Sequence, residues 1–182
     1  MRSEDIFALG LGLLPPWEVK SVLFEDTPDG KELHIYIDFK RGSRFANDKG
    51  EMVSAYDTEN KEWRHLNFFE HKCYLHCRVP RIYMSDGSVR MAEVPWARPG
   101  SGFTLLFEAY TMKLIESEMP VSSVAKHTRV TAPRIWRVFH HWVSKAREHI
   151  DLSGVRRIGI DETSSRKGHN YITNFVDLDT RQ

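Results

Sequence analysis

Residues 121–139, VSSVAKHTRVTAPRIWRVF, contain two helical patterns separated by a short break. The first, Val121–His127, has serines near its start that can cap a helix. Thr131 is suited to the N-cap of the second, because Pro133 is tolerated in a first helical turn but not later. A short helix, a tight turn and a longer basic helix are typical of a helix-turn-helix, whose second helix enters the major groove of DNA with its N-terminus first.

Apolar residues at helical spacing extend this region in both directions. They run from Phe103 to Leu114 upstream, and from Ile135 to Val143 in the second helix. Residues 119–160 hold 8 Lys/Arg against 2 Asp/Glu, a net charge of +6, whereas residues 1–60 hold 7 against 12. The basic segment favours a polyanion as partner. A three-helix bundle with a basic solvated surface is the alternative that the pattern leaves open.

DNA binding is the interpretation that we favour for residues 98–150. The arginines of the second helix lie in its early turns, where a base edge or a phosphate can be reached. Cations that contact phosphate would also make the affinity fall with added salt. The candidate DNA-binding residues are Lys126, Arg129, Thr131, Arg134, Arg137 and Lys145.

The first 97 residues are rich in strand patterns. Trp17–Phe24 and Glu32–Phe39 alternate between apolar and polar residues around the turn tetrad Thr27–Gly30, and Lys72–Val79 alternates again. We predict a small antiparallel sheet of four to six short strands. The stretch Arg98–Gly102 is the strongest linker candidate, which places a domain boundary between residues 97 and 98.

Residues 156–163 and 171–177, RRIGIDET and YITNFVD, are separated by a polar turn and predict a β-hairpin within residues 151–182. The first apolar run stops abruptly at Asp161, so we expect this carboxylate at the mouth of a strand. A carboxylate on a rigid strand end suits Mg²⁺, which prefers hard oxygen ligands and usually takes one or two carboxylates from a protein.

Six segments together carry a resemblance to a known family, namely residues 61–70, 93–103, 134–138, 159–163, 167–169 and 175–178. In this order and spacing, the chain resembles the N-terminal part of transposases of the ISL-three insertion-sequence family over nearly its full length. The resemblance implies an α+β fold with three parts. These are a zinc-ribbon-like antiparallel β module at residues 1–97, a helix-turn-helix domain at 98–150, and the first hairpin of a ribonuclease H-like core at 151–182.

The resemblance also implies a chemistry. Asp161 matches the first aspartate of a DDE triad, which binds Mg²⁺ (or Mn²⁺) for strand cleavage and transfer at transposon ends. Glu162 points to the opposite face of the strand, and Asp177 and Asp179 lie on the very next strand, where this fold does not place the second ligand. The remaining carboxylates are expected beyond Gln182. Since one carboxylate cannot hold two metal ions, we expect the chain to be catalytically inactive alone.

The resemblance is weakest at the zinc ligands. Relatives usually carry Cys-x-x-Cys pairs after a Gly-Ser-x-Phe segment and after Pro-Arg, but here residues 42–50 and 80–88 contain no cysteine. A structural zinc site needs four Cys or His ligands. Cys73 and Cys77 fall on the strand between these places, and strand alternation sends His76 to the opposite face. We therefore expect no bound zinc.

The implied partner is double-stranded DNA in the form of transposon terminal inverted repeats, together with further copies of the chain. The favoured function is that of a transposase fragment that binds transposon ends. The alternative is a stand-alone DNA-binding remnant of a transposase that acts as a repressor. An ordinary helix-turn-helix transcription factor would account for residues 103–149 but not for the hairpin at residues 159–177.

Cysteine use and hydropathy bear on the compartment. Cys73 and Cys77 sit four residues apart on one strand face, too far for an easy disulfide, which fits a reducing cytoplasm. No stretch approaches the ~18 apolar residues of a membrane span. The apolar segment at residues 6–16 follows Glu4 and Asp5 and precedes no cleavage site, unlike a signal peptide. We expect a cytoplasmic, nucleoid-associated bacterial protein.

Overall fold

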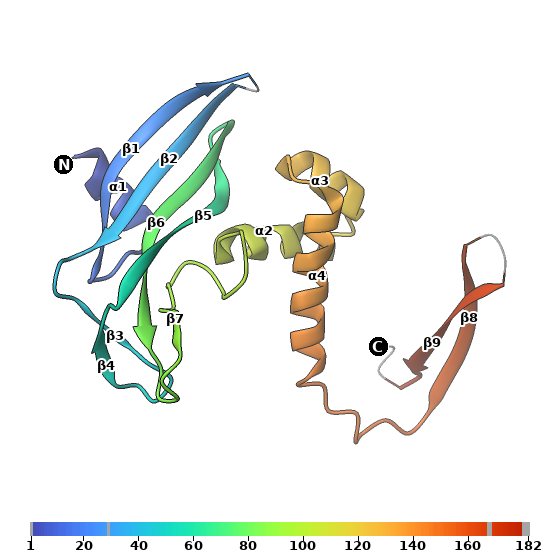
Figure 1. The fold of residues 1–182 in the computed structure, drawn as a ribbon. Coiled ribbons are helices and arrows are strands. Elements are labelled where there is room, and N and C mark those ends of the chain that lie inside the picture. Colours follow the sequence, from blue (N-terminus) through green and yellow to red (C-terminus); the bar gives the residue numbers. More distant parts are fainter. Residues whose placement is uncertain (1, 29, 167–168, 180–182) are drawn as a thin grey trace. The chain divides into compact units, whose positions relative to one another are not determined.

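The computed structural model describes residues 2–28, 30–166 and 169–179, and the chain is mixed α+β (Figure 1). It divides into two compact units, Met1–Val138 and Phe139–Gln182. The first unit contains α1 (Ser3–Gly10), β1 (Trp17–Thr27), β2 (Gly30–Phe39), β3 (Arg44–Ala46), β4 (Met52–Ser54), β5 (Asp57–Phe68), β6 (His71–Tyr83), β7 (Val89–Met91), α2 (Leu105–Glu116) and α3 (Val121–Thr128). None of the helices in the described ranges has the length and hydropathy needed to cross a bilayer.

The main sheet has the strand order β1-β2-β6-β5, with β7 paired to β6. The β1–β2 and β5–β6 pairs are antiparallel hairpins, but β2 and β6 run parallel, with Leu33 opposite Cys73 and Ile37 opposite Cys77. The predicted number of four to six strands is confirmed, and three of the four strand pairs are antiparallel as predicted, but the β2–β6 pair is parallel. The chain leaves β2 through the β3–β4 hairpin and β5, so β6 re-enters beside β2 in the same direction. Its four long strands have 10 to 13 residues.

The core of the β module follows the predicted alternation along β2 and β6. Leu33, Ile35 and Ile37 are at most 3% exposed, as are Cys73 and Leu75. Burying one such side chain contributes about 1.5–3 kcal/mol to folding. The indoles of Trp17, Trp63 and Trp96 add edge-to-face contacts at centroid distances of 5.0 and 5.7 Å.

The segment expected to be a linker, Arg98–Gly102, is fastened on two sides. The Arg64 N–H of β5 donates to the Gly102 carbonyl at 3.0 Å, and the Thr104 N–H donates to the Arg64 carbonyl at 3.1 Å. Thr104 then caps α2, since its hydroxyl accepts from the Phe107 N–H at 3.3 Å. The sheet and the helices are thus joined by backbone hydrogen bonds within one unit.

A buried ion pair strengthens this junction. The Glu108 side chain on α2 is 0% exposed, and the Arg98 Nε donates to its carboxylate at 3.0 Å. The Ser101 hydroxyl donates to the other carboxylate oxygen at 2.6 Å. The loop that enters α2 is therefore held to the helix by charge as well as by hydrogen bonds.

We expect the stability of the chain to fall as the pH drops from 6.5 towards 4, because of His65. This imidazole lies against the Thr104 hydroxyl, Nδ1 to Oγ1 2.9 Å. Burial, with a smaller contribution from the Arg64 charge, lowers the pKa of His65 from 6.5 to about 4. Above pH 6.5 His65 is neutral in both the folded and the unfolded chain, and the chain has its full stability. Between the two pKa values only the unfolded chain binds the proton, so up to about 3 kcal/mol is lost.

Urea unfolding at pH 7.5 and pH 4.5 measures this loss. His65→Gln should shrink the difference between the two pH values, whereas the exposed His149→Gln should preserve it. Equal pH dependence in wild type and His65→Gln would contradict the assignment.

The second unit contains the β8 (Ile158–Arg166) and β9 (Asn170–Asp177) hairpin, which confirms the predicted strand-turn-strand. The helix α4 (Ala132–Arg147) spans the division between the units. Asp161 pairs with Asn174 in the middle of β8, so the expectation that it ends a strand was wrong. Polar residues after Asp161 continue the strand because β9 supplies the ladder hydrogen bonds. The predicted turn residues Lys167 and Gly168 lie outside the described residues.

Candidate DNA-binding site

The α3–α4 turn has the geometry that the sequence predicts. Arg129 ends α3 in the left-handed conformation, with φ 56° and ψ 43°, and the Val130 N–H donates to the Ala125 carbonyl at 3.0 Å. This pattern closes a helix and reverses the chain within a few residues. The Thr131 carbonyl then accepts from the Arg134 N–H at 3.0 Å, which starts α4 at Ala132.

The apolar sides of the helices are well buried. At most 1% of each side chain is exposed for Val124 on α3 and for Ile135 and Val138 on α4. Phe107 on α2 is 2% exposed. The Tyr110 hydroxyl and the His127 Nε2 lie 2.9 Å apart and join α2 to α3. These contacts fix α3 and the first turns of α4 from one side.

The outward face of α4 carries several of the predicted residues. Arg137 is exposed, and His140 and Ser144 follow it three and seven residues later on the same helical face. Trp136 beside them is 44% exposed. Lys126 on α3 and Thr131 at the start of α4 are also exposed. A base edge or a phosphate can approach this face without displacing core side chains.

Lys145 lies farther along α4. It follows Arg137 by eight residues, about 12 Å along a helix axis. Its side chain is exposed, and its Nζ lies 5.6 Å from the centre of the Trp142 ring. This distance from the helix start suits a phosphate contact better than a base contact.

Arg134 is placed differently from Arg137. Its guanidinium lies over the Phe103 ring at 4.3 Å, and it would lie 3.3 Å from a Cβ added at Gly102. The side chain is half-buried, so part of its role is to pack α4 against the segment before α2. A small residue at position 102 leaves room for this packing.

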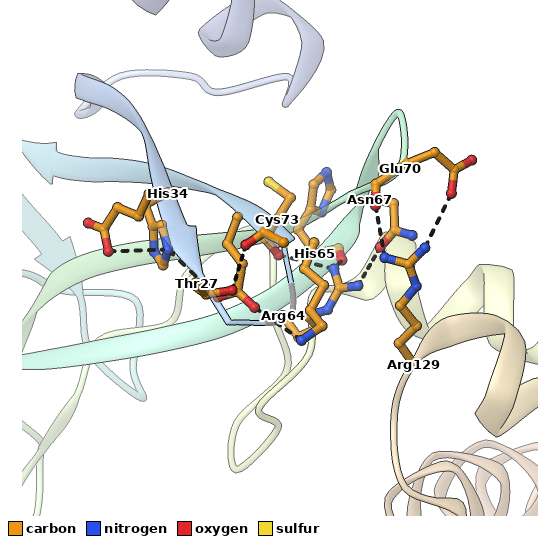
Figure 2. A network of polar contacts seen from close by, with 12 residues as sticks. Thr27, His34, Arg64, His65, Asn67, Glu70, Cys73 and Arg129 are labelled. Atoms are coloured by element: carbon orange, nitrogen blue, oxygen red, sulfur yellow. Dashed lines mark hydrogen bonds and ion pairs between the residues drawn. The ribbon is translucent and has the colours of Figure 1, made fainter.

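Arg129 is engaged by the β module (Figure 2). Its Nη1 donates to the Glu70 carbonyl at 2.9 Å, and its Nη2 lies 3.3 Å from the Glu70 carboxylate. Glu70 sits in the turn between β5 and β6. The turn of the helix-turn-helix is therefore tied to the tip of that hairpin, and 44% of the Arg129 side chain is still exposed.

Sequence reasoning did not single out Trp136, His140 or Glu70. For His140 a signal existed, since it follows Arg137 by three residues on the same helical face, and Trp136 precedes His140 by four. The pairing of Glu70 with Arg129 bridges 59 residues, and nothing local to either position indicates it.

Asp161 is exposed on one face of the β8–β9 hairpin. Glu162 lies on the other face, as expected, where its carboxylate accepts from the Thr173 hydroxyl at 3.4 Å. In the part of the chain that the structure describes, no group of three or more His, Cys, Asp or Glu side chains could hold a metal ion. The assignment of Asp161 as a magnesium ligand thus depends on the resemblance.

The cysteines do not form a zinc site. Cys73 and Cys77 are buried in the sheet, and burial raises the pKa of each thiol to about 12, which disfavours the thiolate that zinc needs. His76 lies on the other face with its Nε2 2.7 Å from the Nδ1 of His34. The residues present therefore do not fit zinc.

A polar contact joins the two turns in which the resemblance led us to look for cysteine pairs. Asp48, in the β3–β4 turn, accepts from the Ser85 N–H at 2.8 Å and from the Ser85 hydroxyl at 2.5 Å. These hydrogen bonds hold the pKa of Asp48 below its usual value, and the bond from the Ser85 hydroxyl contributes most. The contact crosses between the β3–β4 turn and the β6–β7 turn without a metal.

We expect metal removal to leave the β module intact. The melting temperature should be the same before and after dialysis against EDTA, because no set of three or more His, Cys, Asp or Glu side chains among the described residues could hold zinc. Asp48→Ala should lower it, while Asp26→Ala, a change at an exposed carboxylate, should not. One zinc per chain in elemental analysis, with a melting temperature that falls on chelation, would contradict this.

Comparison with known proteins finds a family model that matches the helices and two relatives that match nearly the whole chain. Residues 92–143 match the family model described as the helix-turn-helix domain of transposase family ISL3. Over 99% of its length the chain is 25% identical to the transposase for insertion sequence element IS1557 of two Mycobacterium tuberculosis strains. It spans 42% of the length of that protein. No solved structure matches the chain significantly.

Proposed function

We propose that the chain, whose residues 92–143 match the helix-turn-helix domain of transposase family ISL3, binds the terminal inverted repeats of an insertion element through α3 and α4. The observation that carries the proposal is the exposed polar face of α4, with Arg137 at its centre and Lys126 and Thr131 at the adjoining end. This face has cations and hydrogen-bond donors on a helix whose opposite side is fixed in a core.

The residues have different roles in the proposed complex. Arg137 and the neighbouring His140 read base edges in the major groove, where arginine pairs with guanine through two hydrogen bonds. Lys126, Thr131 and Lys145 contact phosphates and set the position of the helix on the duplex. Arg129 and Arg134 act mainly by holding the helix-turn-helix to the hairpin tip and to Phe103.

A fluorescence anisotropy titration tests the proposal. The chain should bind a duplex from the end of its element more tightly than a shuffled duplex of the same length. With three to five phosphate contacts, the logarithm of the binding constant should fall with the logarithm of salt concentration with a slope of about −3 to −5. Equal affinity for both duplexes would contradict specific end binding. We also propose that copies of the chain associate with one another on the DNA. The size of the complex, which the anisotropy reflects, reports this self-association.

For the hairpin, we propose that β8 and β9 begin a ribonuclease H-like core in which Asp161 is the first carboxylate of a DDE triad. The resemblance supports this, as do the exposed apolar residues Ile160 and Phe175, 66% and 68% exposed, which suit a hairpin packed against further structure.

A bound metal pair would supply an activated nucleophile and stabilise the leaving oxygen. Asp161 alone would hold no such pair, so incubation with Mg²⁺ or Mn²⁺ and end DNA should give no nicks. Discrete nicks would refute this.

A further inference from the structure

The tip of the β5–β6 hairpin presents an unusual aromatic residue. Phe69 has a positive φ of 52° and its side chain is 81% exposed. A bulky residue in this conformation is a genuine outlier, which glycine or asparagine would adopt at lower cost. Backbone strain at an exposed residue points to a function of that residue rather than to a role in folding.

Packing of the protein core does not explain why a phenylalanine stands at position 69, because Phe68 and not Phe69 packs against the sheet. The half-buried Phe68 ring lies 5.3 Å from Phe7 and 6.3 Å from Phe24 and closes that end of the sheet. Phe69 contacts the outer edge of Phe68, with ring centroids 4.7 Å apart, and otherwise projects into solvent.

The hairpin below the tip is braced (Figure 2). Arg64 is 3% exposed, and its guanidinium donates to the carbonyls of His65 and Cys73, the latter at 3.2 Å, and to the Asn67 side-chain oxygen. Together these bonds link β5 and β6 immediately before the turn. The tip is therefore a rigid support for Phe69 rather than a loose loop.

The same tip is fixed to the helix-turn-helix. Glu70 follows Phe69 directly, and Arg129 in the α3–α4 turn holds both its carbonyl and its carboxylate. The carboxylate is thereby neutralised, and the exposed Lys126 lies on the helix that ends at Arg129. The tip that carries Phe69 therefore adjoins the α3–α4 turn, and its acidic side chain is paired with an arginine of that turn.

We propose that Phe69 is a second DNA-contacting element, which lies in the minor groove next to the major groove that α4 occupies. The inference rests on the proposed DNA binding by α3 and α4. Apolar side chains contact sugars in the minor groove and wedge between base steps there. DNA is favoured over a protein partner because the Arg129–Glu70 contacts join the tip to the α3–α4 turn of the proposed DNA-binding helices and balance the charge of Glu70.

Phe69→Gly is the informative variant, because glycine keeps the positive φ and relieves its strain. The melting temperature should be unchanged or higher. Affinity for the element-end duplex should fall by about tenfold, and hydroxyl-radical footprinting should lose protection on one flank while the rest remains. Tyr83→Ala, a matched control at the far end of β6 with a 49% exposed aromatic, should bind as wild type.

The outcomes separate this inference from the function on which it rests. If wild type binds end DNA and Phe69→Gly gives the same affinity and footprint, the inference is overturned while the proposed function stands. If Phe69→Gly keeps the footprint but loses self-association in sedimentation velocity, the tip contacts protein and the DNA assignment is overturned. If the wild-type chain binds no duplex, both fail together.

Discussion

Replacement of Arg98 by alanine is expected to lower the free energy of unfolding by about 3 kcal/mol or more. Glu108 is fully buried, and the Arg98 Nε lies 3.0 Å from its carboxylate. Removal of the guanidinium would take a charged hydrogen-bond donor from a fully buried carboxylate, which costs far more than the loss of a surface ion pair. Urea unfolding followed by tryptophan fluorescence and circular dichroism measures the effect.

Two variants make the Arg98 result specific. Arg90→Ala removes an exposed arginine paired with Asp86 at 3.2 Å and should cost about 1 kcal/mol or less. Arg98→Met combined with Glu108→Gln removes both charges and should recover much of the lost stability. An Arg98→Ala effect no larger than that of Arg90→Ala would show that the junction does not depend on this ion pair.

Replacement of Arg137 by alanine should weaken binding to element-end DNA by about 1–3 kcal/mol, tenfold to more than a hundredfold. Its side chain is exposed on α4, and its Nε donates a long hydrogen bond to the Pro133 carbonyl at 3.4 Å. The melting temperature should therefore stay close to that of wild type. If Arg137 reads a base, discrimination against a shuffled duplex shrinks; if it binds phosphate, the salt slope falls by about one unit.

Arg134→Ala and Arg41→Ala serve as comparisons for Arg137. Arg134 stacks on Phe103, so its loss should lower the melting temperature as well as the affinity. Arg41 is exposed in a turn of the β module, and its loss should change neither. Unchanged affinity in Arg137→Ala would return α4 to the alternative of a basic solvated face.

Local patterns predicted the helices and strands well. Thr131 and Pro133 marked the start of α4 because an N-cap and a first-turn proline are local requirements. Alternation placed Cys73 and Cys77 on the buried face of β6 and His76 on the other. The hairpin at residues 158–177 followed from β-branched and aromatic runs on either side of a polar turn.

The pairing of strands and side chains that lie far apart in the sequence could not be predicted from local patterns. Nothing in β2 or β6 alone indicates that the two strands run parallel, because their partners are set by the path of the chain through β3, β4 and β5. The apolar run before Asp161 suggested a strand end, yet the backbone ladder with β9 extends the strand past it. Gly, Pro and Ser in residues 98–102 resembled a linker, whereas the buried Glu108 and the β5 backbone bind that segment.

The candidate site was predicted only in part for the same reason. Charge and helical position indicated six residues, but the fold uses two of them differently. Arg134 packs on Phe103, and Arg129 binds Glu70 of the hairpin tip. Arginine in a sequence does not reveal whether its partner lies within the protein or outside it, since the partners here are 31 and 59 residues away.

Guanine N7 methylation protection provides the sharpest test of the proposal that α4 lies in the major groove of transposon-end DNA. N7 is reached only from the major groove. Wild type should protect a short run of guanines within the terminal repeat, and Arg137→Ala should lose that protection at one or two of them. A complex that forms without any protected guanine, or protection identical in wild type and Arg137→Ala, would contradict the claim.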